Sequence, residues 1–167
     1  MTAIQTMRSI RVLSCAFTCC PPGKLGFSGG EDVLGWNLVC QVARHHEVWI
    51  LTDGRNRRSI EEGLSESSLR RAHFVYVDLP SLLKPLLKFQ GGHQFYYYIW
   101  QIKAYFAARQ ANKDIGFDLF HHITYANDWM VNFIGALLPV TYVRGPGGGA
   151  HRTPRGLMSE YPRFGRI

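Results

Sequence analysis

The chain has 167 residues and carries 19 Lys and Arg against 12 Asp and Glu, which leaves a formal net charge of +7. Its apolar fraction of 46% and charged fraction of 19% exclude an intrinsically disordered tail. A chain of this length can build one hydrophobic core and is short for two, so we expect a single domain over residues 1–167. The longest charge-free apolar stretch, 129–143, is shorter than the ~20 residues that a transmembrane helix requires.

Strand-like and helix-like patterns alternate along the chain. The apolar runs that predict strands are residues 10–16, 48–52, 74–77, 117–121 and 140–143. The patterns that predict helices are residues 33–43 with Asp32 as a cap, 60–71, 96–112 and 128–138, while the link at 80–85 stays unassigned. This alternation predicts an α/β fold with a doubly wound, mostly parallel, Rossmann-like sheet and right-handed crossovers.

Four cysteines are present, at positions 15, 19, 20 and 40, which is few for a disulfide-stapled secreted domain. The spacing of the first three matches no common zinc pattern. The apolar stretch before Cys15 is shorter than the core of a secretion signal. We therefore expect reduced thiols, no metal and a cytoplasmic protein, with a peripheral position at the inner face of the membrane left open.

The first loop that could bind a ligand precedes the first predicted helix and contains Gly29, Gly30 and Glu31. Ligands of open parallel sheets bind beyond the carboxyl ends of the strands, which is where this loop is expected. Glycines let a backbone approach a ligand closely, and amides at a helix start attract anions. Glu31 and Asp32 compete for those amides, so the loop suits sugar hydroxyls better than a bare phosphate. An ordinary helix start behind a flexible loop is the alternative.

The second loop leaves the fourth predicted strand with His121, His122 and Thr124. A histidine at a strand end can exchange a proton near neutral pH or hold a ligand hydroxyl. Adjacent residues of a strand point to opposite faces, so only one of the two histidines can face the ligand. This argues against a metal site. A structural histidine bonded to the backbone is the alternative for either residue.

The third loop, residues 145–154, contains Gly147, Gly148 and Gly149 after a strand that we expect to be buried. Consecutive glycines cost conformational entropy, so a plain connector explains them poorly. The loop is not a P-loop, because Ala-His-Arg stands where Gly-Lys-Ser/Thr is required.

Four segments resemble motifs of one group of sugar-transferring enzymes. Residues 29–36 read G-G-E-D-V-L-G-W where the group has G-S-E-P-G-x-G-W, and residues 97–101 match Y-x-x-W-Q. Residues 117–124 match F-D-L-x-H-H-x-T, and residues 145–154 match G-P-V-G-G-G-E-x-T-P with three departures. Because the motifs keep the family's order over most of the chain, the sequence resembles the N-terminal domain of a family-4, retaining glycosyltransferase. That family has two facing Rossmann-like domains, the GT-B fold.

The resemblance implies transfer of a sugar from a nucleotide-sugar donor to a hydroxyl acceptor with retention, without a further cofactor. It implies that His121 is the catalytic residue and contacts the transferred sugar. The implied substrate-binding residues are Gly29, Gly30, Glu31, His122, Thr124, Gly147, Gly148 and Gly149. The implied partners are the nucleotide-sugar and a sugar or lipid-linked acceptor; no nucleic acid is expected.

Departures from the family pattern accompany the matches. Asp32 and Val33 replace a Pro and a Gly of the first motif, and His151 replaces the Glu of the last one. The E-x7-E pair of the family's nucleotide-sugar domain is absent, because no two glutamates are eight residues apart. We therefore expect an N-terminal half whose nucleotide-sugar domain is supplied in cis or in trans, and a chain that is inactive alone.

Two other classes of function stay open. From Arg144 onward five arginines accompany one glutamate, so 5 − 1 gives +4, and these residues would suit a non-enzymatic polyanion binder or a contact with acidic lipid. Asp53 stands where the ribose-binding acid of a NAD-dependent oxidoreductase would be. The loop after the first strand is too long, and lacks the G-x-G-x-x-G, for that enzyme class.

Overall fold

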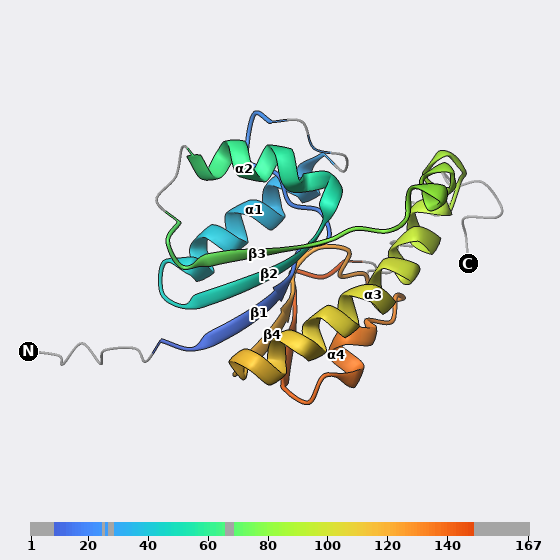
Figure 1. Cartoon of the computed structure of the whole chain (residues 1–167). Coiled ribbons are helices and arrows are strands. Elements are labelled where there is room, and N and C mark those ends of the chain that lie inside the picture. Colours follow the sequence, from blue (N-terminus) through green and yellow to red (C-terminus); the bar gives the residue numbers. More distant parts are fainter. Residues whose placement is uncertain (1–8, 25, 27–28, 66–68, 149–167) are drawn as a thin grey trace, which may run out of the picture.

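The computed structural model describes residues 9–24, 26, 29–65 and 69–148 of the chain (Figure 1). Five strands form one parallel sheet in the order β3-β2-β1-β4-β5. The strands are β1 (Arg11–Cys15), β2 (Glu47–Asp53), β3 (Ala72–Val77), β4 (Leu119–His122) and β5 (Thr141–Arg144). The α-helices are α1 (Gly30–Ala43), α2 (Arg57–Ser65), α3 (Gly92–Ile115) and α4 (Phe133–Leu137), and the 3₁₀ helices are η1 (Gly54–Asn56) and η2 (Ser81–Lys88).

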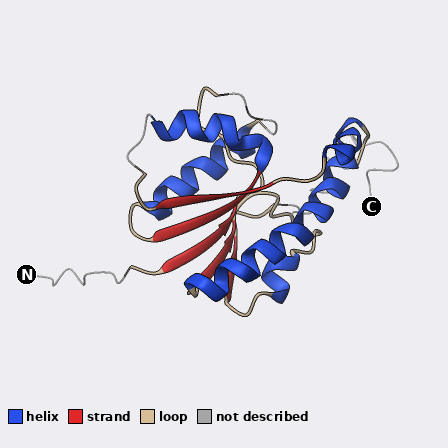
Figure 2. Ribbon diagram, in the orientation of Figure 1, coloured by secondary structure: helices blue, strands red, loops and turns tan. Residues whose placement is uncertain are grey.

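The helices cover both faces of the sheet, α1 and α2 on one and α3 and α4 on the other (Figures 1 and 2). Alternate residues of β1 supply the two cores. Leu13 and Cys15 pack on the α3 side, whereas Val12 packs on the α1 side. A central strand that is buried on both faces explains the continuous apolar run at this point of the sequence. The predicted α/β fold with a parallel, Rossmann-like sheet is therefore confirmed.

Two predicted helices are shorter in the structure. The Asn132 side chain accepts a hydrogen bond from the Gly135 amide at 2.6 Å and begins α4 there, so the prediction of a helix from residue 128 was wrong. The prediction for 60–71 was also wrong at its end, because α2 stops at Ser65 and β3 starts at Ala72. Capping side chains and sheet pairing override the helical periodicity in both cases.

Other boundaries and surroundings also differ from the predictions. Gly29, with a φ of 63°, is the N-cap of α1, and Asp32 is a buried residue of the first turn rather than the cap. The segment around residues 80–85 forms η2. The fifth strand is exposed at all four residues rather than buried, because β5 pairs with β4 alone among the described strands. None of the described helices has the length and hydropathy of a membrane-spanning helix.

Candidate functional site

The sheet has its topological switch point at β1, which pairs with β2 on one side and β4 on the other. The chain moves outward from β1 through β2 to β3 and then returns to β4. In open parallel sheets, ligands bind beyond the carboxyl ends of the strands at this point. The loops that follow β1 and β4 therefore form the candidate site.

Two hydrogen bonds join the loop after β4 to the β1–α1 connection and to the first turn of α1. The Tyr125 amide donates to Glu31 Oε1 at 2.6 Å, and the Thr18 amide donates to Thr124 Oγ1 at 3.1 Å. Gly35 of α1 lies against the same point, because a Cβ there would lie 2.5 Å from the Thr18 carbonyl oxygen and 2.9 Å from Thr124 Cγ2. The first and second predicted loops are thus in contact, although they lie far apart in the sequence.

The glycine-rich segment after β5 packs on the same loop. His121 Nε2 lies 2.8 Å from the Gly145 carbonyl oxygen. Gly148 donates its amide to the Ala126 carbonyl at 3.2 Å and accepts from the Asp128 amide at 2.8 Å. Arg144 forms an ion pair with Asp128 across the base of this segment. The second and third predicted loops therefore also meet.

The predicted site residues differ in their accessibility. Gly29, Gly30 and Gly147 are exposed, Glu31, His121 and Gly148 are half-buried, and Thr124 and His122 are buried. Gly149 lies outside the described residues. The structure brings this set to the carboxyl edge of the sheet, with the two histidines on opposite faces of β4 as the strand geometry predicts. Their roles in binding or catalysis stay predictions.

His122 has a structural environment. Its Nε2 lies 3.0 Å from the Tyr97 hydroxyl, and its Nδ1 lies 3.4 Å from the Tyr142 hydroxyl. Burial lowers the pKa of His122 to about 4, although a hydrogen bond with the backbone of Thr124 favours the charged form. The imidazole is therefore neutral at pH 7 and does not serve as a proton donor there.

The matched Y-x-x-W-Q segment of α3 also holds structure together. Trp100 Nε1 donates to the Val77 carbonyl oxygen at 2.9 Å. The Gln101 side chain accepts from the Phe133 amide at 2.9 Å and donates to the Val131 carbonyl oxygen at 3.2 Å, which fixes the start of α4. These contacts connect α3 with the carboxyl end of β3 and with the segment between β4 and α4.

Sequence reasoning missed an aromatic cluster at this edge. Phe17 is fully buried, and the centroid of its ring lies 4.9 Å from that of Tyr125. Arg55 lies over the Tyr96 ring at 4.7 Å from its centroid and forms an ion pair with Asp53 at 2.8 Å. The only advance signal was the polar Asp53 and Arg55 at the end of a buried strand, since contacts between distant aromatic residues leave no local pattern.

Tyr125 has a left-handed backbone conformation with a φ of 58°. A bulky residue adopts this conformation only where its surroundings fix it, and such positions are common at ligand sites. The Glu31 carboxylate supplies one fixing contact through the Tyr125 amide. Burial, followed by the charge of Glu31, raises the pKa of the Tyr125 hydroxyl.

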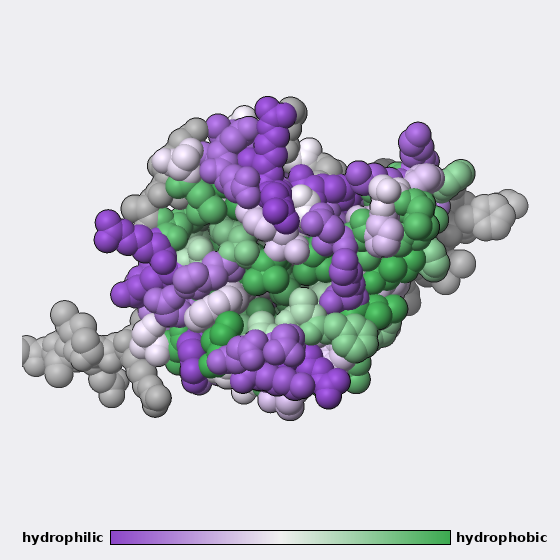
Figure 3. Space-filling view, viewed as in Figure 1, coloured by the Kyte–Doolittle hydropathy of each residue, from purple (hydrophilic) through white to green (hydrophobic). Residues whose placement is uncertain are grey.

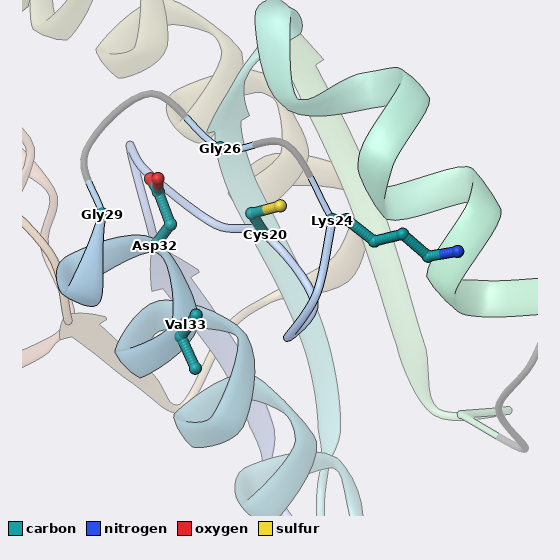
Figure 4. A pocket seen from close by; sticks show the side chains of 6 residues that line it. All are labelled: Cys20, Lys24, Gly26, Gly29, Asp32 and Val33. Atoms are coloured by element: carbon teal, nitrogen blue, oxygen red, sulfur yellow. The ribbon is translucent and has the colours of Figure 1, made fainter.

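The cavity beside the first loop is small. It measures about 90 Å³ and is lined by Cys20, Lys24, Gly26, Gly29, Asp32 and Val33 (Figure 4). The Asp32 carboxylate points toward Gly26, whose position leaves no room for a Cβ, and the Lys24 side chain extends away toward α2. Small-molecule pockets usually measure ~300–1,000 Å³, so this cavity by itself does not hold a sugar nucleotide.

The thiols and acidic groups of the described part of the chain form no metal site. No group of three or more His, Cys, Asp or Glu side chains is arranged for a metal ion there. The four cysteines are free, three of them buried and Cys40 half-buried. Burial raises the pKa of the Cys15 thiol to about 12, which makes it a core residue rather than a nucleophile.

Comparison with known protein families and curated proteins identifies no relative: no family model matches the chain, and neither does any curated protein. The chain is a Rossmann-like, parallel α/β domain. Its function must accordingly be argued from the arrangement of its own residues.

Proposed function

We propose that this chain is the acceptor-side, N-terminal domain of a retaining glycosyltransferase of the GT-B type. One observation carries the proposal: the segments at residues 29–36, 117–124 and 145–148, which match the family's motifs in the sequence, lie against one another at the switch point. Hydrogen bonds between Glu31 and Tyr125 and between His121 and Gly145 connect them. The motif segments therefore stand at the edge where open parallel sheets bind ligands, which is where a substrate of this family would have to bind.

His121 is the residue that we assign to the transferred sugar. A carbonyl oxygen can only accept a hydrogen bond, so the contact with Gly145 places the proton of a neutral imidazole on Nε2. Nδ1 is then the acceptor nitrogen and can receive a hydrogen bond from a sugar hydroxyl. The strand and the glycine-rich segment together hold the ring in this tautomer, which is the role of a positioning contact at a histidine.

Glu31 is assigned to the acceptor hydroxyl. Its carboxylate already accepts the Tyr125 amide, and a carboxylate has lone pairs for several donors. Gly29 and Gly30 precede it and are exposed, so the backbone there leaves space for a substrate. Gly147 and Gly148 form the other border of this substrate region in the proposal.

The nucleotide-sugar is assigned to a second domain, since the E-x7-E pair does not occur in this sequence. Group transfer requires donor and acceptor to be held together in one geometry, which contributes much of the rate enhancement. The domain alone is therefore expected to bind a sugar acceptor without appreciable turnover.

Sugar binding by the chain itself tests the proposal. Saturation-transfer NMR with a panel of mono- and oligosaccharides should detect binding, and His121→Ala should weaken it at least tenfold, since the substitution removes a positioned polar group. His73→Ala is the matched control, because His73 is exposed on β3 and pairs with Glu47. In a reaction completed with a nucleotide-sugar domain, His121→Ala should lower turnover by a similar factor. Unchanged binding and turnover would remove His121 from the site.

The two other function classes have less support. The Asp53 carboxylate is bonded to Arg55, where a NAD enzyme needs it for the ribose, and the β1–α1 loop spans residues 16–29. Calorimetric titration with NAD and with nucleotide-sugars separates that class from the proposed one. Polyanion binding was predicted from the basic end of the sequence, of which all but Arg144 lies outside the described residues, and it stays a prediction.

A further inference from the structure

The outer surface of η2, α3 and α4 carries large apolar side chains that no described segment covers. Six of them are between 52% and 76% exposed: Leu82, Phe89, Phe95, Ile102, Phe106 and Leu137. Figure 3 shows hydrophobic residues gathered on this side of the molecule. We call this surface the η2–α3–α4 face. Contiguous exposed apolar surface of this kind marks a site of contact with another molecule or a membrane.

The exposed side chains of α3 form one line along the helix. Phe95, Ile102, Phe106, Arg109 and Lys113 are separated by seven, four, three and four residues, and all five are exposed. This spacing keeps them on one side of an α-helix. The first three are apolar and lie toward the carboxyl edge of the sheet, while the last two are basic and lie toward the opposite edge.

A shallow groove lies beside the exposed apolar residues of α3 and extends the apolar surface to α4. It measures about 310 Å³ and is lined by Ile102, Tyr105, Phe106, Phe133 and Leu137, so α3 and α4 contribute to it together. All five lining residues are apolar or aromatic. The groove lacks the convergent charged groups that orient a polar small molecule.

The charge of this part of the chain is unbalanced. Residues 79–115 carry five Lys and Arg, at positions 84, 88, 103, 109 and 113, against the single carboxylate Asp114, so 5 − 1 gives +4. Residues 9–78 carry eight cationic and eight acidic side chains and are neutral. The positive charge therefore accompanies the exposed apolar residues and attracts a negatively charged surface.

We propose that the η2–α3–α4 face docks on a bilayer that contains anionic lipid. Apolar side chains beside Lys and Arg on one helical surface are the combination that binds at a membrane interface. The apolar groups enter the boundary between headgroups and acyl chains, and the cations contact the anionic headgroups. No spanning segment is needed for this mode of binding.

Docking in this orientation has a consequence for the candidate site. Because η2 follows the carboxyl end of β3 and α3 begins after it, the apolar end of the face lies at the edge of the sheet that holds His121. A docked domain would hold this edge near the lipid surface, where it could receive an acceptor carried on a lipid. This last step rests on the proposed function, whereas membrane docking does not.

Vesicle co-sedimentation of the full chain tests the proposal. The chain should bind vesicles of phosphatidylcholine with phosphatidylglycerol more tightly than vesicles of phosphatidylcholine alone, and added salt should weaken the binding. Ile102→Ser with Phe106→Ser should reduce partitioning at least tenfold, since two exposed apolar groups lose their burial. Leu34→Ser is the matched control, because Leu34 is an exposed apolar residue of α1 on the other side of the sheet.

Charge substitutions separate this face from the basic end of the sequence. Arg109→Gln with Lys113→Gln should weaken partitioning about thirtyfold, at roughly a fivefold loss per cation. Arg58→Gln with Arg70→Gln, two exposed cations outside the face, should have a much smaller effect. Arg163→Gln with Arg166→Gln measures the contribution of the basic end.

Three results would overturn the proposal. The first is absence of binding to anionic vesicles. The second is binding that survives both face variants and is lost in the Arg163 and Arg166 variant. The third is a concentration-dependent dimer that the Ile102 and Phe106 variant dissociates, which would assign the face to a second copy of the chain. Loss of sugar binding with vesicle binding intact would contradict the proposed function alone.

Discussion

The two sides of the sheet are built from different residues and leave different surfaces exposed. On the α3 side the core contains Phe17, Tyr96, Tyr97, Trp100, Phe117 and Phe120, and several of these residues or their neighbours hydrogen-bond across elements. On the α1 side the core is mostly aliphatic, with Trp36 as its single fully packed aromatic residue. The outer surface of the α3 side is apolar and basic. Residues 9–78, which include both helices of the α1 side, have no net charge.

This difference assigns separate tasks to the two sides. Large aromatic residues with a polar group constrain the orientation of neighbouring elements, because the Tyr97 hydroxyl and the Trp100 indole N–H have specific partners in β4 and β3. They contact the carboxyl end of β4, the strand that carries His121. Small residues on the α1 side instead allow close approach, and Gly35 lets α1 touch both switch-point loops. The α3 side thus constrains the orientation of the elements at the carboxyl edge, and the α1 side allows α1 to pack closely against the loops there.

The largest effect should come from the aromatic core. Trp100→Ala should reduce the free energy of unfolding by about 5 kcal/mol, because it leaves a large cavity and removes the donor to the Val77 carbonyl. Trp36→Ala on the α1 side should reduce the free energy of unfolding by about 3 kcal/mol, because it removes the ring that stacks on Phe74 and leaves a cavity. Urea denaturation measures both. Equal losses of unfolding free energy for Trp100→Ala and Trp36→Ala would contradict the proposed difference between the two sides of the sheet.

The close approach at Gly35 should give the next effect. Gly35→Ala should reduce the free energy of unfolding by about 2 kcal/mol, because the new Cβ would lie 2.5 Å from the Thr18 carbonyl oxygen. Gly30→Ala is the control at the start of the same helix, where a Cβ meets nothing within 4 Å. It should be neutral or slightly stabilising, since alanine favours the helix. Equal effects at the two positions would show that α1 is not held tightly at the switch point.

The buried histidine should give stability a dependence on pH. The pKa of His122 is lowered from 6.5 to about 4 in the folded chain, so the unfolded chain binds more protons between these values. The contribution of His122 to the free energy of unfolding is then fully present above pH 6.5 and is lost as the pH falls toward 4. The expected loss between pH 7 and pH 5 is about 2 kcal/mol. His122→Gln should remove most of this fall in urea titrations, and His45→Gln at an exposed position should leave it unchanged. A fall that persists in His122→Gln would place its origin elsewhere.

The periodicity of the sequence determined the fold class because alternating apolar runs and helical patterns respond to local geometry. It located the five strands to within a few residues, and it placed the three loops at the carboxyl edge. It failed where a side chain intervened, as with Asn132 at the start of α4. It also failed at β5, because an apolar run does not reveal whether a strand lies in the centre or at the edge of a sheet.

What only the tertiary structure decided are the contacts between residues that are distant along the chain. The sequence singled out Glu31 and His121, but their hydrogen bonds to Tyr125 and Gly145 depend on how β1, β4 and β5 are ordered in the sheet. The clustering of Phe17, Tyr96 and Arg55 depends on the same order. Local propensity acts over a few residues, whereas strand order is fixed by burial of the two faces together. The sequence could therefore name the segments of the candidate site but not the contacts between them.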